Sequence, residues 1–387
     1  MTTIATDDIS SAGPELTREV LEPMKRRFVG KDEIIDLLGV CLAGGENLFI
    51  LGPPGTAKSA LVQDLGQRFD GRVFDYLLTR FTEPNELFGP FDIRRLREGD
   101  LVTNTEGMLP DADFVFLDEL LNANSAILNS LLMALNERVF RRGQETKRLP
   151  ALMFVGASNR LPEDETLGAL FDRFLLRVVS DNVDDDQLRD VLDAGWVIEQ
   201  NFETPGTTIT TQKIRGLQAA VPRVDLSGVR DDYLELIRRL RNAGVAVSDR
   251  RAVKLQRVIA ASALLCGRAE GRTSDLWVMR YIWEVLEQRE IVREMVDQVI
   301  GKDATDDDLH HGRSTPSTRP DPEAVARDLA AIETELGRDN LEAPRQAHLQ
   351  DRIGVLADRI QWVESAAQRE ALETTINGLW AKLGVKR

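Results

Sequence analysis

The sequence predicts an α/β fold in which a parallel sheet flanked by helices is followed by an all-helical domain and a helical tail. Short apolar runs bounded by Gly or polar residues recur in the first half of the chain, as expected for buried parallel strands. Residues 47–59 have the pattern of a strand, a Gly/Pro turn and the start of a helix. Strand patterns end at the acidic run 181–186, and helical periodicities follow it.

Two helices are expected before the first strand. An apolar stripe of period four predicts a helix over residues 16–28, interrupted by Pro23. Val29 to Asp32 then begin a second helix, which leads directly into the strand at residues 48–51.

The turn after this strand is predicted to bind phosphate groups. Its backbone N–H groups and the positive end of the next helix face one point, where Lys58 can reach the outer phosphates and Ser59 can hold Mg²⁺. The usual pattern has Gly before the Lys, but here the residue is Ala57, whose Cβ is tolerable if its φ is negative. The alternative is a chance Gly/Pro turn before a helix. The expected nucleotide-binding residues are Gly52, Pro53, Pro54, Gly55, Thr56, Ala57, Lys58, Ser59 and Ala60.

A second chemical centre follows the apolar strand at residues 114–117. Asp118 and Glu119 come at its C-terminal end, which is where ligands bind in open α/β sheets. We expect Asp118 to hold Mg²⁺, directly or through water, and Glu119 to polarise the water that attacks the γ-phosphate. The alternative is an acidic helix N-cap, which is common after a strand.

Two more polar positions follow buried strands. Asn159 comes after the strand at residues 152–156 and can orient the attacking water or sense the γ-phosphate, or it simply turns the chain. Arg173 stands before a last strand at residues 174–179. It is either a surface residue paired with Asp172 or a charge donated to a nucleotide.

The domain boundaries are predicted from changes in composition. We expect a nucleotide-binding core at 1–182, with basic hairpins near 86–104 and 138–149, a helical domain at 183–301, a linker at 302–321 and a tail at 322–387. In the helical domain, Ser248 and Asp249 begin a helix immediately before Arg250 and Arg251. The tail carries coiled-coil-like stripes and forms either a self-packed bundle or a partner-docking arm.

Composition limits the possible environments and partners. The net charge of −15 argues against a protein whose whole surface follows nucleic acid, although a local basic patch is compatible with it. Cys41 and Cys266 lie far apart without metal or redox spacing, which favours core thiols in a reducing compartment. No uncharged run is long enough to cross a bilayer, so we expect a cytoplasmic protein without a membrane span.

Taken together, these motifs resemble those of the AAA+ ATPases of the MoxR family, most closely its RavA-like branch. The resemblance covers residues 16–286. It is carried, in order and spacing, by the phosphate-binding turn with Ala before Lys and by four further segments: Leu117-Asp118-Glu119, Gly156-Ala157-Ser158-Asn159, Leu170-Phe171-Asp172-Arg173-Phe174 and Ser248-Asp249-Arg250.

The resemblance implies a doubly wound core with a helical lid, assembled as a hexameric ring that binds ATP and Mg²⁺ between subunits. It assigns MgATP binding and hydrolysis to Lys58, Ser59, Asp118 and Glu119, the polar sensor to Asn159, the finger acting on the neighbour's ATP to Arg173, and the lid sensor to Arg250 or the adjoining Arg251; Val29 and Gly30 would border the adenine. Similar proteins act as chaperone-like remodelers, often with a partner that carries a von Willebrand factor A domain.

Three function classes are compatible with this pattern. We favour an ATP-driven protein remodeler. A nucleic-acid motor is the second class, because both hairpins are locally basic in an acidic chain. A nucleotide-gated scaffold without turnover is the third, and Glu119 argues against it.

Overall fold

A computed structural model of the whole chain shows two compact units, Met1–Thr315 and Pro316–Arg387. The structure describes residues 6–97, 102–142, 145–162, 165–183, 187–200, 209–301 and 310–314, and in the tail residues 326, 329–330, 332–333, 336, 349, 353–354, 356–357, 360 and 366–382. This partition leaves the boundary near residue 182 between core and helical domain as a prediction.

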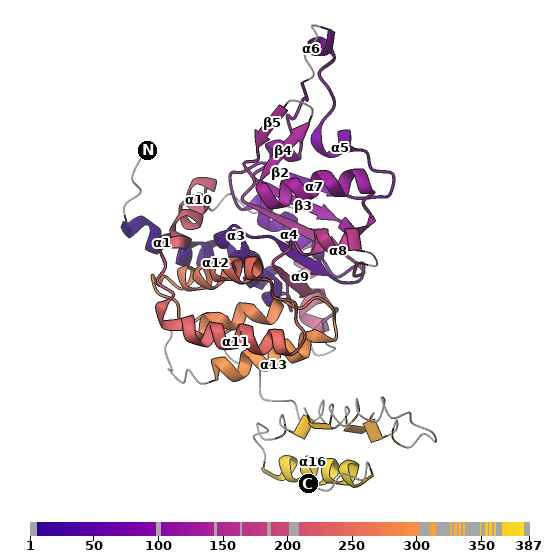
Figure 1. The fold of residues 1–387 in the computed structure, drawn as a ribbon, viewed down its shortest axis with the longest axis vertical. Coiled ribbons are helices and arrows are strands. Elements are labelled where there is room, and N and C mark those ends of the chain that lie inside the picture. The colour runs from indigo at the N-terminus through magenta and orange to yellow at the C-terminus, as the bar shows by residue number, and fades with distance from the viewer. Residues whose placement is uncertain are drawn as a thin grey trace. The chain divides into compact units, whose positions relative to one another are not determined.

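The first unit is built on one sheet of five parallel strands in the order β2-β3-β6-β1-β7 (Figure 1). The strands are β1 (Leu48–Leu51), β2 (Val73–Leu77), β3 (Phe114–Asp118), β6 (Met153–Ser158) and β7 (Leu176–Val179). They form where the apolar runs predict them. The predicted α/β fold class is confirmed.

Helices cover both faces of the sheet, which explains why β1 and β3 are almost continuously apolar. Leu48 and Ile50 join an apolar core with α3 (Asp32–Gly44) and α4 (Lys58–Gln67), whereas Phe49 and Leu51 join a second core with α7 (Ser125–Glu137) and α8 (Glu165–Phe171). The helices of this part are α1 (Thr6–Leu16), the π-helix η1 (Thr17–Leu21), α2 (Glu22–Arg27), α3 (Asp32–Gly44), α4 (Lys58–Gln67), α5 (Pro84–Phe88), η2 (Leu109–Asp111), η3 (Leu120–Asn122), α7 (Ser125–Glu137) and α8 (Glu165–Phe171).

The expected interruption at Pro23 is wrong. Pro23 lies in the first turn of α2, directly after the π-helix η1, and the residues on both sides of it keep a helical backbone. Helical structure therefore continues from α1 through η1 into α2.

The all-helical part packs on α3. It comprises α9 (Leu188–Gln200), α10 (Thr211–Ala220), η4 (Val221–Arg223), η5 (Ser227–Val229), α11 (Arg230–Asn242), α12 (Asp249–Leu265), η6 (Thr273–Tyr281) and α13 (Gln288–Ile300). The expected helix at residues 276–286 is instead the 3₁₀ segment η6, which ends at Tyr281. Trp277 and Trp283 there are fully buried, so their spacing reflects burial and not one face of an α-helix.

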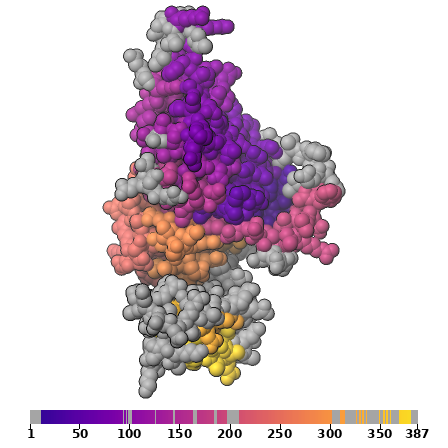
Figure 2. Space-filling view, turned by 90° about the vertical axis from the view of Figure 1, so that its right-hand side faces the viewer, coloured from indigo at the N-terminus to yellow at the C-terminus, as the bar shows by residue number. Residues whose placement is uncertain are grey.

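The two basic inserts, near residues 86–104 and 138–149, contact each other at one end of the first unit. The strands β4 (Val139–Arg142) and β5 (Glu145–Arg148) pair antiparallel near the expected positions. The first insert has a hairpin stem, with Phe91 bridged to Thr103, but its outer arm is the short helix α6 (Ile93–Arg97). Figures 1 and 2 show α6 projecting from this end of the unit.

The tail has an apolar core of its own. The described residues include α16 (Ala366–Lys382). Buried side chains from the three predicted stripes pack together: Leu329, Ile332, Leu349, Ile353, Leu356, Ile360, Leu372, Ile376 and Leu379. These contacts are those of a self-packed bundle, while Val325, Val363 and Leu383 lie outside the described residues. No described helix has the length and apolar composition that a bilayer span requires.

Candidate functional site

The predicted nucleotide-binding residues meet because three neighbouring strands end at one edge of the sheet. The phosphate loop, residues 52–57, follows β1, and Asp118 ends β3. Asn159 follows β6, which lies between β3 and β1 in the sheet. Carboxyl ends of parallel strands share an edge, so residues 52, 118 and 159 converge despite their separation in sequence.

The phosphate loop has one strained residue. Ala57 has φ +63°, so the condition of a negative φ at this position is not met, and the Cβ is accommodated in the left-handed region. The left-handed conformation turns the chain from the loop into α4, and a side chain adopts it at a cost of about 1–2 kcal/mol. Ala is the smallest side chain that can occupy this position. Gly55, with φ +87° and no neighbouring atom within 4 Å of a Cβ, lies at the open tip of the loop.

The loop is held against the sheet from both sides. Gly52 donates its N–H to the Ser158 carbonyl at 3.0 Å. The Ser180 hydroxyl donates to the Thr56 carbonyl at 3.1 Å. The Lys58 ammonium, which is buried, donates to the carbonyls of Gly52 and Pro53 at 2.7 and 2.8 Å. Pro53, Pro54 and Gly55 remain exposed, as do Ala57 and Ala60.

The Ser59 hydroxyl donates to Asp118 Oδ2 at 2.8 Å. This contact joins the two chemical centres that the sequence places 59 residues apart. A hydroxyl and a carboxylate suit Mg²⁺, which keeps several waters and takes one or two protein ligands together with phosphate oxygens. Among the described residues no group of three or more His, Cys, Asp or Glu is arranged to hold a metal, so these donors fit a cation that arrives with phosphate.

Glu119 lies beside Asp118 in a strained, partly buried position. Its φ is +50°, and its N–H donates to Asp118 Oδ1 at 2.9 Å. Burial and the Asp118 charge raise the pKa of Glu119, against the opposing effects of Lys58, Arg160 and a hydrogen bond from the Asn159 backbone. The carboxylate also accepts from Asn122 Nδ2 at 3.5 Å. Glu119 and Asn159 are therefore neighbours, as the sequence predicts.

Gly30, which follows Val29, lies against the segment that follows β7. A Cβ on Gly30 would come within 2.6 Å of Val183 Cγ1, and its φ of +71° also favours glycine. The next residue, Lys31, donates to Ser180 Oγ at 3.4 Å. Because Ser180 also holds the Thr56 carbonyl, this corner adjoins the phosphate loop.

The remaining predicted residues, Arg173 and Arg250, lie at the opposite end of the sheet. The Arg173 carbonyl accepts from Asn47 Nδ2 at 3.1 Å, and Asn47 immediately precedes β1. Five residues of strand geometry separate Asn47 from Gly52 by about 16 Å. The structure therefore does not bring Arg173 to the phosphate loop of its own chain.

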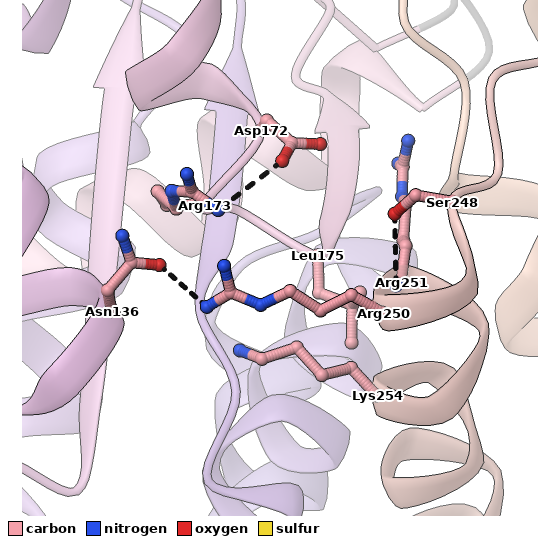
Figure 3. A pocket seen from close by; sticks show the side chains of 8 residues that line it. All are labelled: Asn136, Asp172, Arg173, Leu175, Ser248, Arg250, Arg251 and Lys254. Carbon is pink, nitrogen blue, oxygen red and sulfur yellow. Dashed lines mark hydrogen bonds and ion pairs between the residues drawn. The ribbon is translucent and has the colours of Figure 1, made fainter.

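Arg173 and Arg250 line one pocket (Figure 3). Arg173 Nη1 lies 3.5 Å from Asp172 Oδ2, and its buried Nε has no hydrogen-bond partner among the described residues. The exposed Arg250 donates through Nη2 to Asn136 Oδ1 at 3.0 Å. The other lining residues are Leu175, Ser248, Arg251 and Lys254.

Arg251 differs from Arg250 because its side chain is committed to the fold. It is 4% exposed and donates to the Ile282 carbonyl at 2.7 Å and to Glu284 at 3.2 Å. Burial lowers the pKa of Arg251, with Glu284 opposing this shift. Of the two candidates, Arg250 has the side chain that is available to a ligand.

Sequence reasoning missed several neighbours of these residues. Ser180 and Asn122 carry no motif, and their contacts depend on the packing of distant strands. Asn136 is 114 residues from Arg250 and offers no signal. Lys254 could have been found from the sequence, since it follows Arg250 by four residues on α12 and shares its helical face.

Both the sheet-containing part and the helical part of the first unit match known protein families. A family model of the MoxR domain in MoxR-vWA-beta-propeller ternary systems matches residues 15–219. A model of an AAA lid domain matches residues 229–296. The matches cover the sheet and the helical part that packs on it.

Individual relatives agree with these matches. Two uncharacterised proteins of Methanocaldococcus jannaschii are each 34% identical, over 69% and 73% of this chain and 71% and 74% of their own lengths. A Mycobacterium tuberculosis protein named chaperone MoxR1 is 28% identical over 42% of this chain and 43% of its own. A solved structure from Cytophaga hutchinsonii, described as a candidate ATPase, has a TM-score of 0.61 at 19% identity, over 76% of this chain and 96% of that one. This last similarity concerns the fold alone.

Proposed function

The chain belongs to the MoxR family of AAA+ ATPases, and from this premise we propose that it hydrolyses MgATP at sites shared between subunits of a ring and thereby remodels client proteins. The RavA-like branch and a hexameric ring are the finer parts of the proposal and follow from the sequence resemblance.

The contact between Ser59 and Asp118 supports this proposal most strongly. It sets a hydroxyl and a carboxylate 2.8 Å apart beside a backbone loop that suits phosphates. In the proposed reaction Lys58 exchanges its loop carbonyls for outer phosphate oxygens, and Glu119 accepts a proton from the attacking water that Asn159 helps to orient. Mg²⁺, when bound through Ser59 and Asp118, supplies charge neutralisation on the phosphates.

The position of Arg173 and Arg250 supports a shared site. Both lie at the amino end of the sheet, roughly 16 Å along β1 from the phosphate loop of the same chain. A guanidinium there serves phosphoryl transfer only if a second subunit brings its nucleotide to it. Arg173 is thus assigned as the finger and Arg250 as the lid sensor, both acting on the neighbour's ATP.

The remodelling role and the partner follow from the family. The matching model is defined on systems that contain a von Willebrand factor A protein, and one relative is named a chaperone. We therefore assign a protein client and a von Willebrand factor A domain partner. A cytoplasmic location is proposed because both cysteines are free, as is usual in a reducing compartment.

Two measurements test the proposed function, the first for hydrolysis and the second for the shared site. Glu119→Gln should lower the turnover number by at least about 100-fold while nucleotide binding is kept; unchanged phosphate release would remove Glu119 from its role. Mixing Arg173→Ala with Lys58→Ala subunits should restore turnover above that of either variant alone. The mixture pairs an intact nucleotide site with an intact finger, and equal low activity at matched assembly size would contradict a shared site.

One observation favours a nucleic-acid motor as the second candidate. Arg94, Arg95 and Arg97 are exposed on the projecting α6, and their side chains have no hydrogen-bond or ion-pair partner among the described residues. By contrast, Arg142 packs over the Phe91 ring at 3.9 Å and bonds the Gly89 carbonyl. Binding to single- and double-stranded DNA across a salt series decides this, because phosphate contacts weaken steeply with salt.

A further inference from the structure

The pocket in Figure 3 contains a cation to which neither the motifs nor the family resemblance gives a role, Lys254. We propose that Lys254 contacts the terminal phosphates of a nucleoside triphosphate held by a second copy of the chain, as a third cation beside Arg173 and Arg250. This inference rests on the proposed shared site and adds a phosphate-binding residue to it.

The helix α12 places Lys254 in position. Lys254 follows Arg250 by four residues, so the two side chains lie one above the other on the same helical face. Figure 3 shows them extending in parallel from α12 toward the side of the pocket that holds Asn136 and Arg173. The Lys254 side chain is 34% exposed, which leaves part of it available to an incoming ligand.

The pocket has more positive than negative charge. Four cationic side chains line it, against the single carboxylate of Asp172. Two of these cations also have a carboxylate partner outside the lining: Arg251 lies 3.2 Å from Glu284, and Lys254 lies 3.0 Å from Glu46. The buried Nε of Arg173 has no hydrogen-bond acceptor among the described residues. An excess of cations with an unused donor suits a phosphate group, which accepts several charge-assisted hydrogen bonds.

Glu46 pairs with Lys254 but does not depend on it alone. Lys254 Nζ lies 3.0 Å from Glu46 Oε2, but Arg257 Nε is also 3.4 Å from Glu46 Oε1 and lies outside the pocket lining. The buried carboxylate therefore keeps a cationic partner if Lys254 moves to a phosphate. Arg257 also provides a control, because it shares the Glu46 contact and lies outside the pocket lining, although it donates in addition to the Gly44 carbonyl at 3.0 Å.

The triphosphate has to come from another subunit. Glu46 immediately precedes Asn47, so its contact with Lys254 places that side chain at the amino end of β1, with Arg173. The phosphate loop follows the other end of this strand. A nucleotide bound in the same chain is thus directed away from Lys254.

Steady-state kinetics of the full-length chain is the first test. Lys254→Ala should lower the turnover number for ATP about tenfold or more with little change in KM, since the contact acts on charge that develops in the transition state. Lys254→Arg should keep most of the activity, and Lys254→Met keeps the aliphatic stem in case Lys254→Ala fails to fold. Arg257→Ala should stay within about twofold of the parent. Equal losses in Lys254→Ala and Arg257→Ala would mean that Lys254 serves Glu46 alone, and the proposal would fail.

Subunit mixing shows whether the phosphate belongs to a second copy. Lys254→Ala mixed with Lys58→Ala should exceed the activity of either variant, because the second supplies an intact Lys254 to the first. No gain here, when Arg173→Ala with Lys58→Ala does gain, would overturn the role of Lys254 and leave the shared site standing. No gain in either mixture, at equal assembly size by sedimentation, would overturn the shared site itself.

Discussion

The two ends of β1 differ in how completely the chain satisfies its own charges. At the carboxyl end Lys58 donates to two loop carbonyls, and Ser59 closes on Asp118. At the amino end Arg173 keeps a buried Nε without an acceptor among the described residues, in a pocket with excess positive charge. The comparison shows a loop whose polar groups are satisfied within the chain at one end and, in the proposed shared site, cations that need a ligand from a second copy at the other.

The largest expected difference separates binding from turnover. Lys58→Ala should abolish detectable ATP binding, because it removes the cation that reaches the outer phosphates. Arg173→Ala should leave the affinity of the chain for ATP within about threefold, yet lower turnover by a factor of about 10³. Calorimetric binding and phosphate release on both variants check this. If Arg173→Ala lost affinity to the same degree as Lys58→Ala, the two ends would not be separate sites.

A smaller effect should mark the metal position at the carboxyl end. Asp118→Asn keeps the size of the side chain and removes its charge, so a higher Mg²⁺ concentration, by about tenfold, should be needed for half-maximal turnover. Asp172→Asn, at the amino end, is the control and should leave the Mg²⁺ dependence unchanged. A titration of activity with Mg²⁺ measures both.

Lowering the pH should reduce turnover through Glu119, at the carboxyl end of the sheet. Burial and Asp118 raise the pKa of Glu119, and the deprotonated form is the one that accepts a proton. Turnover should therefore be present above this raised pKa and decline as the pH falls through it, by about tenfold per pH unit below it. ATP binding measured over the same range is the control. A turnover that stayed constant down to the ordinary Glu value would contradict the raised pKa.

The smallest expected effect concerns the strain in the phosphate loop. Ala57→Gly removes a side chain from a left-handed residue, which relieves about 1–2 kcal/mol, and adds flexibility to the unfolded chain that costs about 0.5–1 kcal/mol. The free energy of unfolding should rise by about 0.5–1 kcal/mol, as measured by denaturant titration. Ala60→Gly, within the helix, should lower it. A loss of stability in Ala57→Gly would show that Ala57 carries no strain.

The sequence predicts the carboxyl end well because its signals are local. Apolar runs bounded by polar residues locate β1 and β3, and the rule that carboxyl ends share an edge brings Asp118 to Ser59. The conformation of Ala57 was not predictable, since a positive φ in an Ala depends on how the loop is held by β6 and Ser180. Local pattern identifies the residues, and tertiary packing sets their geometry.

The amino end was harder to predict because its contacts are distant in sequence. Arg173 and Arg250 have recognisable motifs, but their common pocket joins residues from α7, the segment before β7, and α12. The choice between Arg250 and Arg251 depends on Ile282 and Glu284, which no motif relates to them. The 3₁₀ form of η6 was missed for a different reason. Its residues from Ser274 to Tyr281 are all buried, so no exposed polar face shows the helical period.

Asn47 connects β1 to the segment that carries Arg173. Its amide nitrogen holds the Arg173 carbonyl at 3.1 Å and its oxygen accepts from Arg138 at 2.8 Å, while the same strand continues into the phosphate loop. A displacement of the loop along the strand axis would pass through β1, which is buried along its length, to the backbone of Arg173. In the proposed shared site, this strand would therefore connect the loop that holds one nucleotide to the arginine that acts on the neighbour's nucleotide.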